Sequence, residues 1–489
     1  MPPLPLLLWE TPPGLEQVLA QEGIAHRILP DLNPLALAIG RFVLFDGRRI
    51  APSRLRAVIG GENIPIDIDQ LRQGERIDPF VALIDTEAGP MTWRVEGLDL
   101  TERVARYPKG AIRHRLLTRL RALVAEAGGI WARIAPYPFP YRSAFNLRLD
   151  LDEPDPDDYM RLARVRRPLE EATTHFVSTH AYGRDRRVLE DLRRLDTQSH
   201  AHYHVVYRDA ESNRKNLERA HALLVEAGIT PVGFAAPEGR WNAGLDQVLE
   251  DLGYLYSSDF QVAYDDWPAF PWRGGRFSKV LQVPVHPVCE GLFFEAGARD
   301  GRVVADYLGA VVRARLASGD PAFVYGHPER RLGRHPEIVA ALADAIAGEP
   351  LLWRVTLTEF ARWWRWRLSR RWAVVPRAEG RFEVQFDEWE GTYPLALEIF
   401  RGEHIASIPL RGPRSTFRLG DLAYERRRFR IDLPEPRPAR RSRGLKAIVR
   451  TVLDWETVTP VEELPEQSLA DRLKKGLRRW RAGAGGSRP

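Results

Sequence analysis

The chain has almost no cysteine and no long apolar run. Its single cysteine, Cys289, excludes an internal disulfide framework and is compatible with a reducing compartment. No stretch approaches the roughly 18 consecutive apolar residues of a membrane span. The opening MPPLPLLLWETPPG lacks a positively charged start, a long apolar segment and a small-residue cleavage site. We therefore expect a cytoplasmic protein without a secretory signal.

Signatures of nucleic-acid and nucleotide binding are missing as well. No zinc-finger, RNA-recognition or helix-turn-helix pattern accompanies the net charge of +6, so we expect no nucleic-acid partner. Residues 1–105 contain no glycine-rich loop that would hold phosphate groups. Arginine is abundant, and it clusters near the end of the chain in RRSRGLK and RLKKGLRRWR. Such clusters favour contact with anionic lipid or an acidic glycan.

Changes of pattern divide the 489 residues into five segments. Residues 1–105 alternate apolar runs with helical stretches, which predicts an α/β domain, and a flavodoxin-like fold is one candidate for it. Residues 106–140 contain a connecting helix with one apolar face. Residues 141–368 repeat strand and helix, as a parallel barrel or sheet does. Residues 372–433 predict a small antiparallel β-sandwich, and 434–489 a basic linker and tail.

Residues able to carry chemistry gather in the segment 141–368. The run RLDLDE supplies Asp150 and Asp152 at the end of a predicted strand, and SHAHYH supplies His200 and His204. A spacing of four puts the two histidines on one side of a helical turn, where they can hold one metal ion together. His202, between them, is expected to face away. Two histidines and a carboxylate that leave room for water predict a metal-assisted hydrolase.

Four further motifs follow in the order GFAAPEGRWN, GYLYSSDF, VPVHP and FVYGHPER. With the acidic and histidine motifs, this series resembles the polysaccharide deacetylase family, the NodB-like hydrolases of carbohydrate esterase family 4. The resemblance covers roughly residues 141–367, a little under half of the chain. It implies an α/β fold in which a distorted (β/α) barrel forms the catalytic domain.

The resemblance also implies roles for five residues. Asp150 matches the family's catalytic base and His327, in VYGHP, its general acid. A divalent ion, with zinc expected, would be held by a carboxylate and two histidines: Asp152, His200 and His204. The expected reaction is hydrolysis of an acetyl or related acyl group from an amino sugar, with His327 protonating the departing nitrogen.

The third motif departs from the family at Ala235, where an arginine normally steadies the base carboxylate. Arg148, Arg240 or a backbone donor could take over that function, and the sequence does not choose among them. An acidic neighbour such as Asp259 could keep His327 protonated, although a capping role is an equal alternative.

Four residues near the motifs are candidates for binding substrate: Trp241, Arg240, His286 and Trp267. Tryptophan presents a flat apolar face to a sugar ring, but most tryptophans pack in cores or at their rims. His286, before a proline, could instead close a turn. Cys289 is expected to be a small apolar residue rather than a nucleophile.

The expected partner is a glycan or a lipid-linked sugar. Residues 468–481 place leucines and a tryptophan on one helical face and basic residues on the rest, which predicts peripheral contact with an anionic membrane, at its inner face, through residues 434–489. Two other classes remain open: a glycan-binding protein built on a degenerate barrel, which Ala235 favours, and a membrane-associated scaffold, which the accessory sandwich and the basic tail favour.

Overall fold

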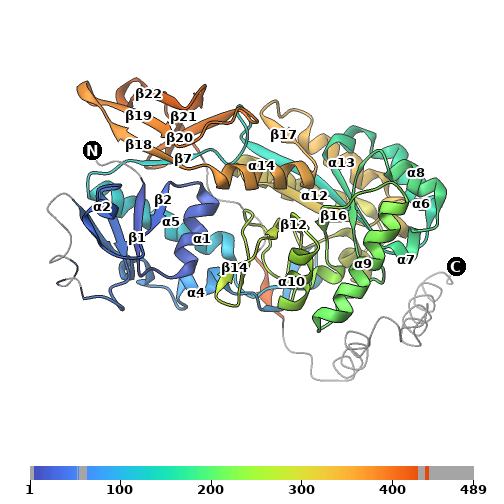
Figure 1. Ribbon diagram of the computed structural model, residues 1–489. Helices are drawn as coiled ribbons and strands as arrows, with labels where there is room; N and C mark the ends of the chain where they lie inside the picture. Colours follow the sequence, from blue (N-terminus) through green and yellow to red (C-terminus); the bar gives the residue numbers. More distant parts are fainter. Residues whose placement is uncertain (1–4, 52, 54, 56–62, 428–434, 440–489) are drawn as a thin grey trace.

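Figure 1 shows the computed structural model, in which the described residues are 5–51, 53, 55, 63–427 and 435–439. An N-terminal α/β unit (blue) lies beside a larger unit built on a curled parallel sheet (green to yellow). Antiparallel strands from late in the chain (orange) lie along both. One continuous buried apolar cluster includes residues of all three parts, from Leu6 to Phe417. Within the described ranges, no helix combines the length and the apolar content needed to cross a membrane.

The N-terminal unit is a four-stranded parallel sheet with helices. Its strand order, β2-β1-β3-β4, is the order in which a flavodoxin-like sheet begins, and the four strands make up the whole sheet as described. Helix α1 starts at a proline and ends at Gly23, whose φ of 70° closes the helix in the left-handed region. The elements are β1 Leu6–Trp9, α1 Pro13–Glu22, β2 His26–Ile28, α2 Pro34–Leu37, β3 Phe42–Phe45, β4 Ile64–Asp67, η1 Ile68–Arg72 and α4 Pro79–Ile84.

A β-hairpin and a long helix lead out of this unit. Strands β5 (Ala88–Val95) and β6 (Leu98–Ala105) are joined by Glu96 and Gly97, whose φ values of 47° and 81° suit a two-residue hairpin turn. Strand β24 (Arg437–Pro438) pairs with β5, so the segment predicted as linker and tail begins with a paired strand. The predicted connecting helix is α5 (Lys109–Glu126).

The larger unit is a curled sheet of parallel strands in the order β15-β12-β11-β10-β9-β8-β16, with β17 paired to the first residues of β8. All nine residues of β8 are buried, as expected for a strand covered on both faces. Because the order follows the sequence from β8 to β15, the sheet winds as half of a (β/α) barrel, and the predicted fold class is confirmed. The strands are β8 Ser143–Leu151, β9 Thr173–Val177, β10 Asp196–Ser199, β11 Gly233–Phe234, β12 Tyr256–Ser257, β15 Leu281–Gln282, β16 Ala322–Gly326 and β17 Leu352–Arg354.

Helices connect these strands and cover the sheet. Thr356 caps the last of them, accepting a hydrogen bond from the Glu359 amide at 3.2 Å, in a Thr-x-x-Glu sequence typical of a capping box. The helices are α6 Pro156–Val165, η2 Arg167–Ala172, α7 Thr179–Tyr182, α8 Arg186–Leu192, α9 Ala210–Glu226, η3 Pro237–Gly239, α10 Ala243–Asp251, α11 Glu290–Glu295, α12 Gly301–Ser318, η4 Pro328–Leu332, α13 Pro336–Ile346 and α14 Leu357–Ser369, and a small hairpin, β13 Trp272–Arg273 with β14 Arg276–Phe277, lies apart.

The late strands form two antiparallel sheets, β18-β19-β22 and β23-β21-β20-β7. The sequence places a sandwich in residues 372–433 alone, but β7 comes from the connecting segment and pairs with β20. The second sheet therefore combines strands from two of the predicted segments. The elements are β7 Trp131–Ile134, β18 Trp372–Pro376, η5 Ala378–Gly380, β19 Arg381–Phe386, β20 Leu395–Arg401, β21 His404–Leu410, β22 Arg414–Arg418, η6 Leu419–Asp421 and β23 Glu425–Arg426.

A buried network of charges joins the three parts. Glu22 of α1 accepts hydrogen bonds from Arg113 of α5 and from Arg133 of β7. Arg113 also donates to Asp266 (2.8 Å) and Arg133 to Glu398 of β20 (2.7 Å). All five residues are less than one tenth exposed. Charges buried in this way are stable only while every partner is present, so the three parts depend on one another.

Candidate metal centre and catalytic residues

Three predicted metal ligands converge at the carboxyl ends of the parallel strands. Asp152 directly follows β8, and His200 directly follows β10. The Asp152 Oδ1 atom lies 3.1 Å from His200 Nε2 and 3.3 Å from His204 Nε2. One donor atom from each residue lies within 4.8 Å of the other two. Residues that are about fifty positions apart in the sequence thus meet at one point.

The donor set fits a divalent metal ion. His200 uses its Nδ1 atom to hydrogen-bond the Ala235 carbonyl at 2.7 Å, which directs its Nε2 atom at Asp152. Asp152 Oδ1 is buried and has no hydrogen-bond partner, although two ring nitrogens are close to it. Burial would raise the pKa of Asp152, but the nearby His204 and His327 hold it well below its usual value. Two histidines and a carboxylate are the ligands of many catalytic zinc sites.

The backbone between the two histidines differs from the prediction. Residues 200–204 form a bend rather than a helical turn, because Ala201 has a φ of 63°. This left-handed residue turns the chain so that both rings still reach Asp152. His202 points elsewhere: its Nδ1 atom pairs with Thr179 Oγ1 at 2.9 Å, and burial lowers its pKa to about 3. His202 is thus a structural residue of the bend.

The predicted base, Asp150, is held by Arg148. The two residues lie two positions apart on β8, so their side chains project from the same face. Arg148 donates from Nε to Asp150 Oδ1 at 2.7 Å and from Nη2 to Oδ2 at 2.5 Å. Both side chains are at most 4% exposed. A two-point pair with a guanidinium fixes the orientation of the carboxylate.

Arg148 therefore makes the contact with the base carboxylate that the resemblance would assign to an arginine at position 235, where this chain has Ala235. Its third contact, from Nη1 to the Ser258 carbonyl, anchors it to the end of β12. Ala235 is fully buried, and its backbone oxygen accepts a hydrogen bond from His200, one of the candidate metal ligands. Arg240, the other candidate, pairs with Glu238 at 2.8 Å instead.

The predicted acid, His327, follows β16 and faces the same point. Its Nε2 atom lies 3.5 Å from Asp152 Oδ2, and its Nδ1 atom lies 2.7 Å from Glu290 Oε1. Burial would lower the pKa of His327, but the negative charges of Glu290 and Asp152 outweigh burial and the nearby Arg331, and raise it well above its usual value. His327 is therefore protonated near neutral pH.

The acidic neighbour of His327 is Glu290 and not Asp259. Asp259 accepts hydrogen bonds from Ser257, Gln282 and the Ala236 amide, and burial raises its pKa to about 6. It fixes the loops after β11 and β12. Glu290 lies at the first position of α11, 37 residues before His327, and was not among the predicted site residues. No motif marks it.

A second group of possible ligand atoms, from Cys289, Glu290 and His327, does not make a metal site. Arg331 Nη1 lies 2.8 Å from His327 Nδ1 and 3.7 Å from Glu290 Oε1, so a guanidinium already supplies the positive charge there. Cys289 is buried and free, as expected of a small apolar residue.

The structure does not bring two of the predicted substrate contacts into the site. Trp267 is 4% exposed and lies under the guanidinium groups of Arg113 and Arg133, with ring-centroid distances of 4.4 and 5.0 Å. His286 is buried between Asp265 (2.9 Å) and Tyr307 (3.0 Å). Both are core residues. Their neighbours in the sequence do not show whether they lie in the core or in the site. Trp241 and Arg240 do lie in the loop after β11 and stay candidates for substrate contact.

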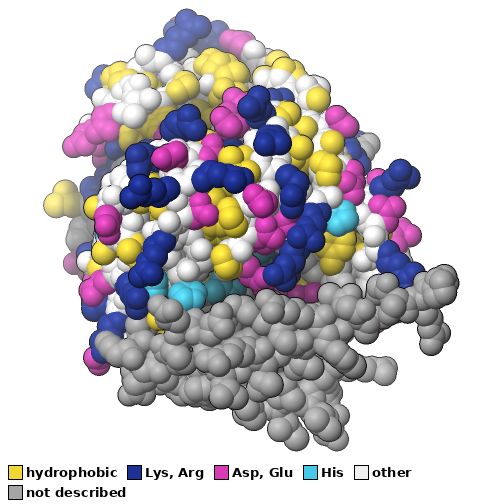
Figure 2. Space-filling model, turned by 90° about the vertical axis from the view of Figure 1, so that its right-hand side faces the viewer, with side chains coloured by type: hydrophobic (Ala, Val, Ile, Leu, Met, Phe, Trp, Pro, Cys, Tyr) yellow, Lys and Arg dark blue, Asp and Glu magenta, His cyan; other side chains and the backbone are white. Residues whose placement is uncertain are grey.

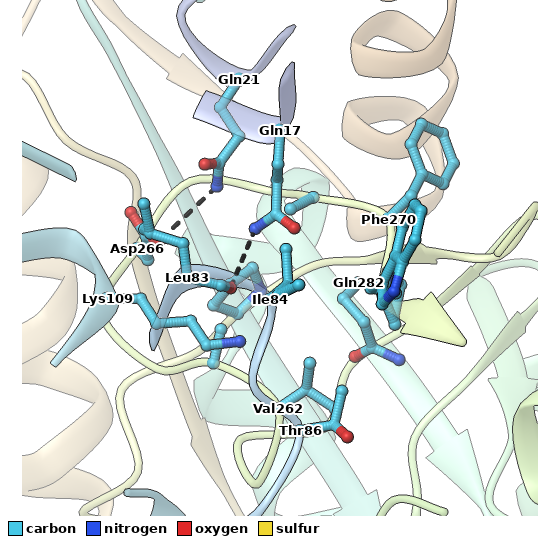
Figure 3. Close-up of a pocket in the computed structure, with 15 residues that line it drawn as sticks. Gln17, Gln21, Leu83, Ile84, Thr86, Lys109, Val262, Asp266, Phe270 and Gln282 are labelled. Atoms are coloured by element: carbon cyan, nitrogen blue, oxygen red, sulfur yellow. Dashed lines mark hydrogen bonds between the residues drawn. The ribbon is translucent and has the colours of Figure 1, made fainter. Parts of the chain in front are cut away.

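Two hollows lined by described residues include none of the candidate metal ligands and neither the candidate base nor the candidate acid. A cavity of about 10 Å³, enough for one water molecule, lies between the N-terminal unit and the curled sheet (Figure 3), where Gln21 and Lys109 approach Asp266 and Gln282. Figure 2 looks onto the end of the molecule that carries α6 to α9, where acidic, basic and apolar side chains of the described residues are interspersed.

Neither a protein-family model nor a curated protein matches the chain. Several solved structures are similar to it. A Mycobacterium smegmatis protein assigned as a polysaccharide deacetylase shares 21% identity over 48% of this chain and 94% of its own, with a TM-score of 0.41. The solved structures that this chain resembles are family 4 carbohydrate esterases.

Two of these similar structures differ in activity. The family 4 carbohydrate esterase of Streptomyces lividans, solved with acetate, is 16% identical over 43% of this chain and 91% of its own, with a TM-score of 0.31. BA3943 from Bacillus anthracis, a family 4 pseudoenzyme, is 12% identical over 46% and 66%, with a TM-score of 0.32. These likenesses concern the fold of about half of the chain, so the function must be inferred from the residues of the site.

Proposed function

We propose that this protein is a metal-dependent hydrolase that removes an acetyl or related acyl group from an amino sugar of a glycan or glycan precursor. One observation carries the proposal. Asp150 in β8, paired with Arg148, and His327 after the neighbouring strand β16, paired with Glu290, lie at the same end of the sheet as the donors Asp152, His200 and His204. Glu290 raises the pKa of His327, as suits a group that must donate a proton.

The divalent ion, zinc in our proposal, would be held by Asp152, His200 and His204, and when bound it would acidify water and polarise the acyl oxygen. Asp150 takes a proton from the attacking water, and Arg148 keeps its carboxylate oriented. The bond between the water oxygen and the acyl carbon forms as the carbon–nitrogen bond breaks. His327 gives its Nε2 proton to the departing nitrogen, so the products are a carboxylic acid and an amine.

The degenerate-barrel alternative loses its main support. Ala235 favoured it because the arginine for the base was missing, but Arg148 makes two hydrogen bonds to Asp150. The scaffold alternative depends on the accessory sandwich and the basic tail, and of the tail, residues 440–489 lie outside the described residues. Contact with an anionic membrane, a lipid-linked substrate and a cytoplasmic location stay predictions.

The proposal is tested by a metal assay combined with an acyl-release assay. The purified chain, loaded with zinc or cobalt, is incubated with acetylated and formylated amino sugars in polymeric and lipid-linked form. We expect acid to be released from at least one substrate and chelation to stop the release. A metal-loaded chain that binds these sugars and releases no acid would be a binding protein.

A further inference from the structure

The N-terminal unit has a hollow that the proposed reaction does not use. Its volume is about 250 Å³, and residues that follow β1, β2 and β3 line it, at the carboxyl ends of these parallel strands. The chain passes from β1 outward to β2 and then returns to place β3 on the other side of β1. Ligands of open α/β sheets bind in the crevice at such a reversal of strand order.

This hollow is separate from the metal centre. In Figure 1, β1 and β2 lie at the left of the molecule, whereas β16, which precedes His327, lies at the right. The polar side chains that line the hollow are those of Glu10, Thr11, Glu16 and Arg49. Ile28, which is 58% exposed, belongs to an apolar wall that also includes prolines. A wall of this kind beside a few polar groups is typical of a small-molecule site.

The loops around the hollow are held in place by the backbone. The Leu29 amide donates to the Leu8 carbonyl at 2.8 Å, and the Arg49 amide donates to the Asp46 carbonyl at 2.9 Å. Glu10, the first residue after β1, has a φ of 52°, in the left-handed region that favours glycine. Strain of this kind persists where the surrounding structure maintains it, often beside a ligand. The hollow is thus preformed.

One carboxylate of the hollow lacks a positive partner. Arg49 Nη1 lies 3.9 Å from Glu10 Oε2, so these two charges offset each other. Glu16 is half-buried, and within the described residues its carboxylate makes no hydrogen bond or ion pair. Burial, with no opposing charge, raises the pKa of Glu16. A buried or half-buried carboxylate is stabilised by a cation or by hydrogen-bond donors, which the described protein does not supply here.

The missing partner is more suited to an organic cation than to a metal ion or an anion. Among the described residues, the groups with three or more possible metal ligands lie at and beside the metal centre, and none includes Glu10 or Glu16. Two carboxylates facing one guanidinium disfavour a phosphate or a carboxylate ligand. The volume lies somewhat below the roughly 300–1,000 Å³ of sites for drug-sized ligands, which suits a molecule with a single ring.

We infer that the hollow binds a small amine that also carries hydroxyl groups, such as an amino sugar. Its ammonium group pairs with Glu16, its hydroxyl groups form hydrogen bonds with Glu10 and Thr11, and its carbon skeleton packs against Ile28. The inference goes beyond the proposed function and does not depend on it, because the hollow contains no residue of the metal centre.

The test follows the methyl resonance of Ile28 by NMR while the zinc-loaded, methyl-labelled chain is titrated with glucosamine. Ile28→Val identifies the resonance. We expect a saturable shift with glucosamine, and at least tenfold weaker binding of glucose, which has the hydroxyl groups but no amine. Glu16→Gln should weaken the binding of glucosamine about tenfold, the effect of losing a charged partner. Glu126→Gln, at the exposed end of α5, is the matched control and should not change it.

Three results would overturn the inference: no shift of the Ile28 methyl resonance with glucosamine, equal affinity for glucosamine and glucose, or the same affinity for glucosamine in the unmutated chain and in Glu16→Gln. Thermal unfolding without ligand checks that each variant is folded. Because Ile28 lies in the N-terminal unit, its resonance reports on this hollow and not on the metal centre. The acyl-release assay decides the proposed function separately.

Discussion

Arg148 and Asp150 form a two-point ion pair on one face of β8, with Nε 2.7 Å from Oδ1 and Nη2 2.5 Å from Oδ2. The arginine that orients the base thus lies on the same strand as the base. Arg148 also lies close to the rings of Phe176 (5.3 Å) and Tyr325 (5.2 Å), which fix its plane.

Replacing Arg148 with lysine should lower kcat about tenfold or more. Lysine keeps the charge but cannot make the two parallel hydrogen bonds that orient Asp150. Turnover of an acetylated sugar is measured at matched metal content, with Arg313→Lys on the exposed face of α12 as the control. Full turnover by Arg148→Lys would show that orientation by the guanidinium is unnecessary.

Restoring an arginine at the motif position should not help. Ala235 is fully buried, and Asp150 already has its partner, so Ala235→Arg overpacks the site and should destabilise the protein by about 1–3 kcal/mol. Thermal unfolding and kcat are measured together. A stable variant with higher kcat would contradict the role given to Arg148.

The metal should depend on His200 and His204 but not on the histidine between them. The purified chain is expected to hold about one divalent ion, and either His200→Ala or His204→Ala should lose it. His202→Ala should keep it, because His202 pairs with Thr179. Metal content is read by elemental analysis, and full content in the His200→Ala, His204→Ala double variant would end the assignment.

Removing the charge of Glu290 should shift the alkaline limb of the kcat profile to lower pH. The pKa of His327 is raised above its usual value of 6.5, so a protonated His327 is present below that raised pKa and is lost as pH rises through it. In Glu290→Gln the pKa of His327 falls, and activity should be lost at lower pH. Glu295→Gln, an exposed neighbour, should leave the limb in place.

The buried network around Glu22 should make stability sensitive to acid. Burial would raise the pKa of Glu22, but Arg133 and Arg113 lower it below 4.5. Its contribution is fully present above about pH 4.5 and is lost as pH falls through the lower native value. Glu22→Gln should lower the free energy of unfolding by about 3 kcal/mol at pH 7, as measured by denaturant unfolding. On acidification the variant should lose less further stability than the unmutated protein. The same dependence of the unfolding free energy on pH in both proteins would contradict this.

Local patterns predicted much of the fold. The cap at Thr356 and the apolar face of α5 depend on neighbouring residues, so they can be read from sequence. The partner of β7 could not be predicted from sequence. Strand β20 lies more than 250 residues later, and the four residues of β7 do not indicate which strand pairs with them. Trp267 was misassigned for a similar reason, since its two arginine partners come from distant elements.

The site was partly predictable as well. The order of the motifs predicted that Asp152, His200 and His204 form one site. Strand periodicity could also have identified Arg148 as the partner of Asp150, since residues two apart on a strand share a face. Glu290 could not be assigned, because its importance depends on which side chain the chain after β15 places beside His327. Tertiary contacts of this kind leave no periodic signal.

The most direct test of the account compares acetate release by the unmutated chain and by Asp150→Asn at equal zinc content. An asparagine keeps the shape of the base but cannot take a proton from water. We expect the unmutated chain to release acetate from an N-acetylated sugar, and Asp150→Asn to hold the same zinc and lose at least 99% of that activity, about a hundredfold effect for one general base. Equal rates for the two proteins would contradict the central claim that Asp150 is the base of a metal-dependent deacylase.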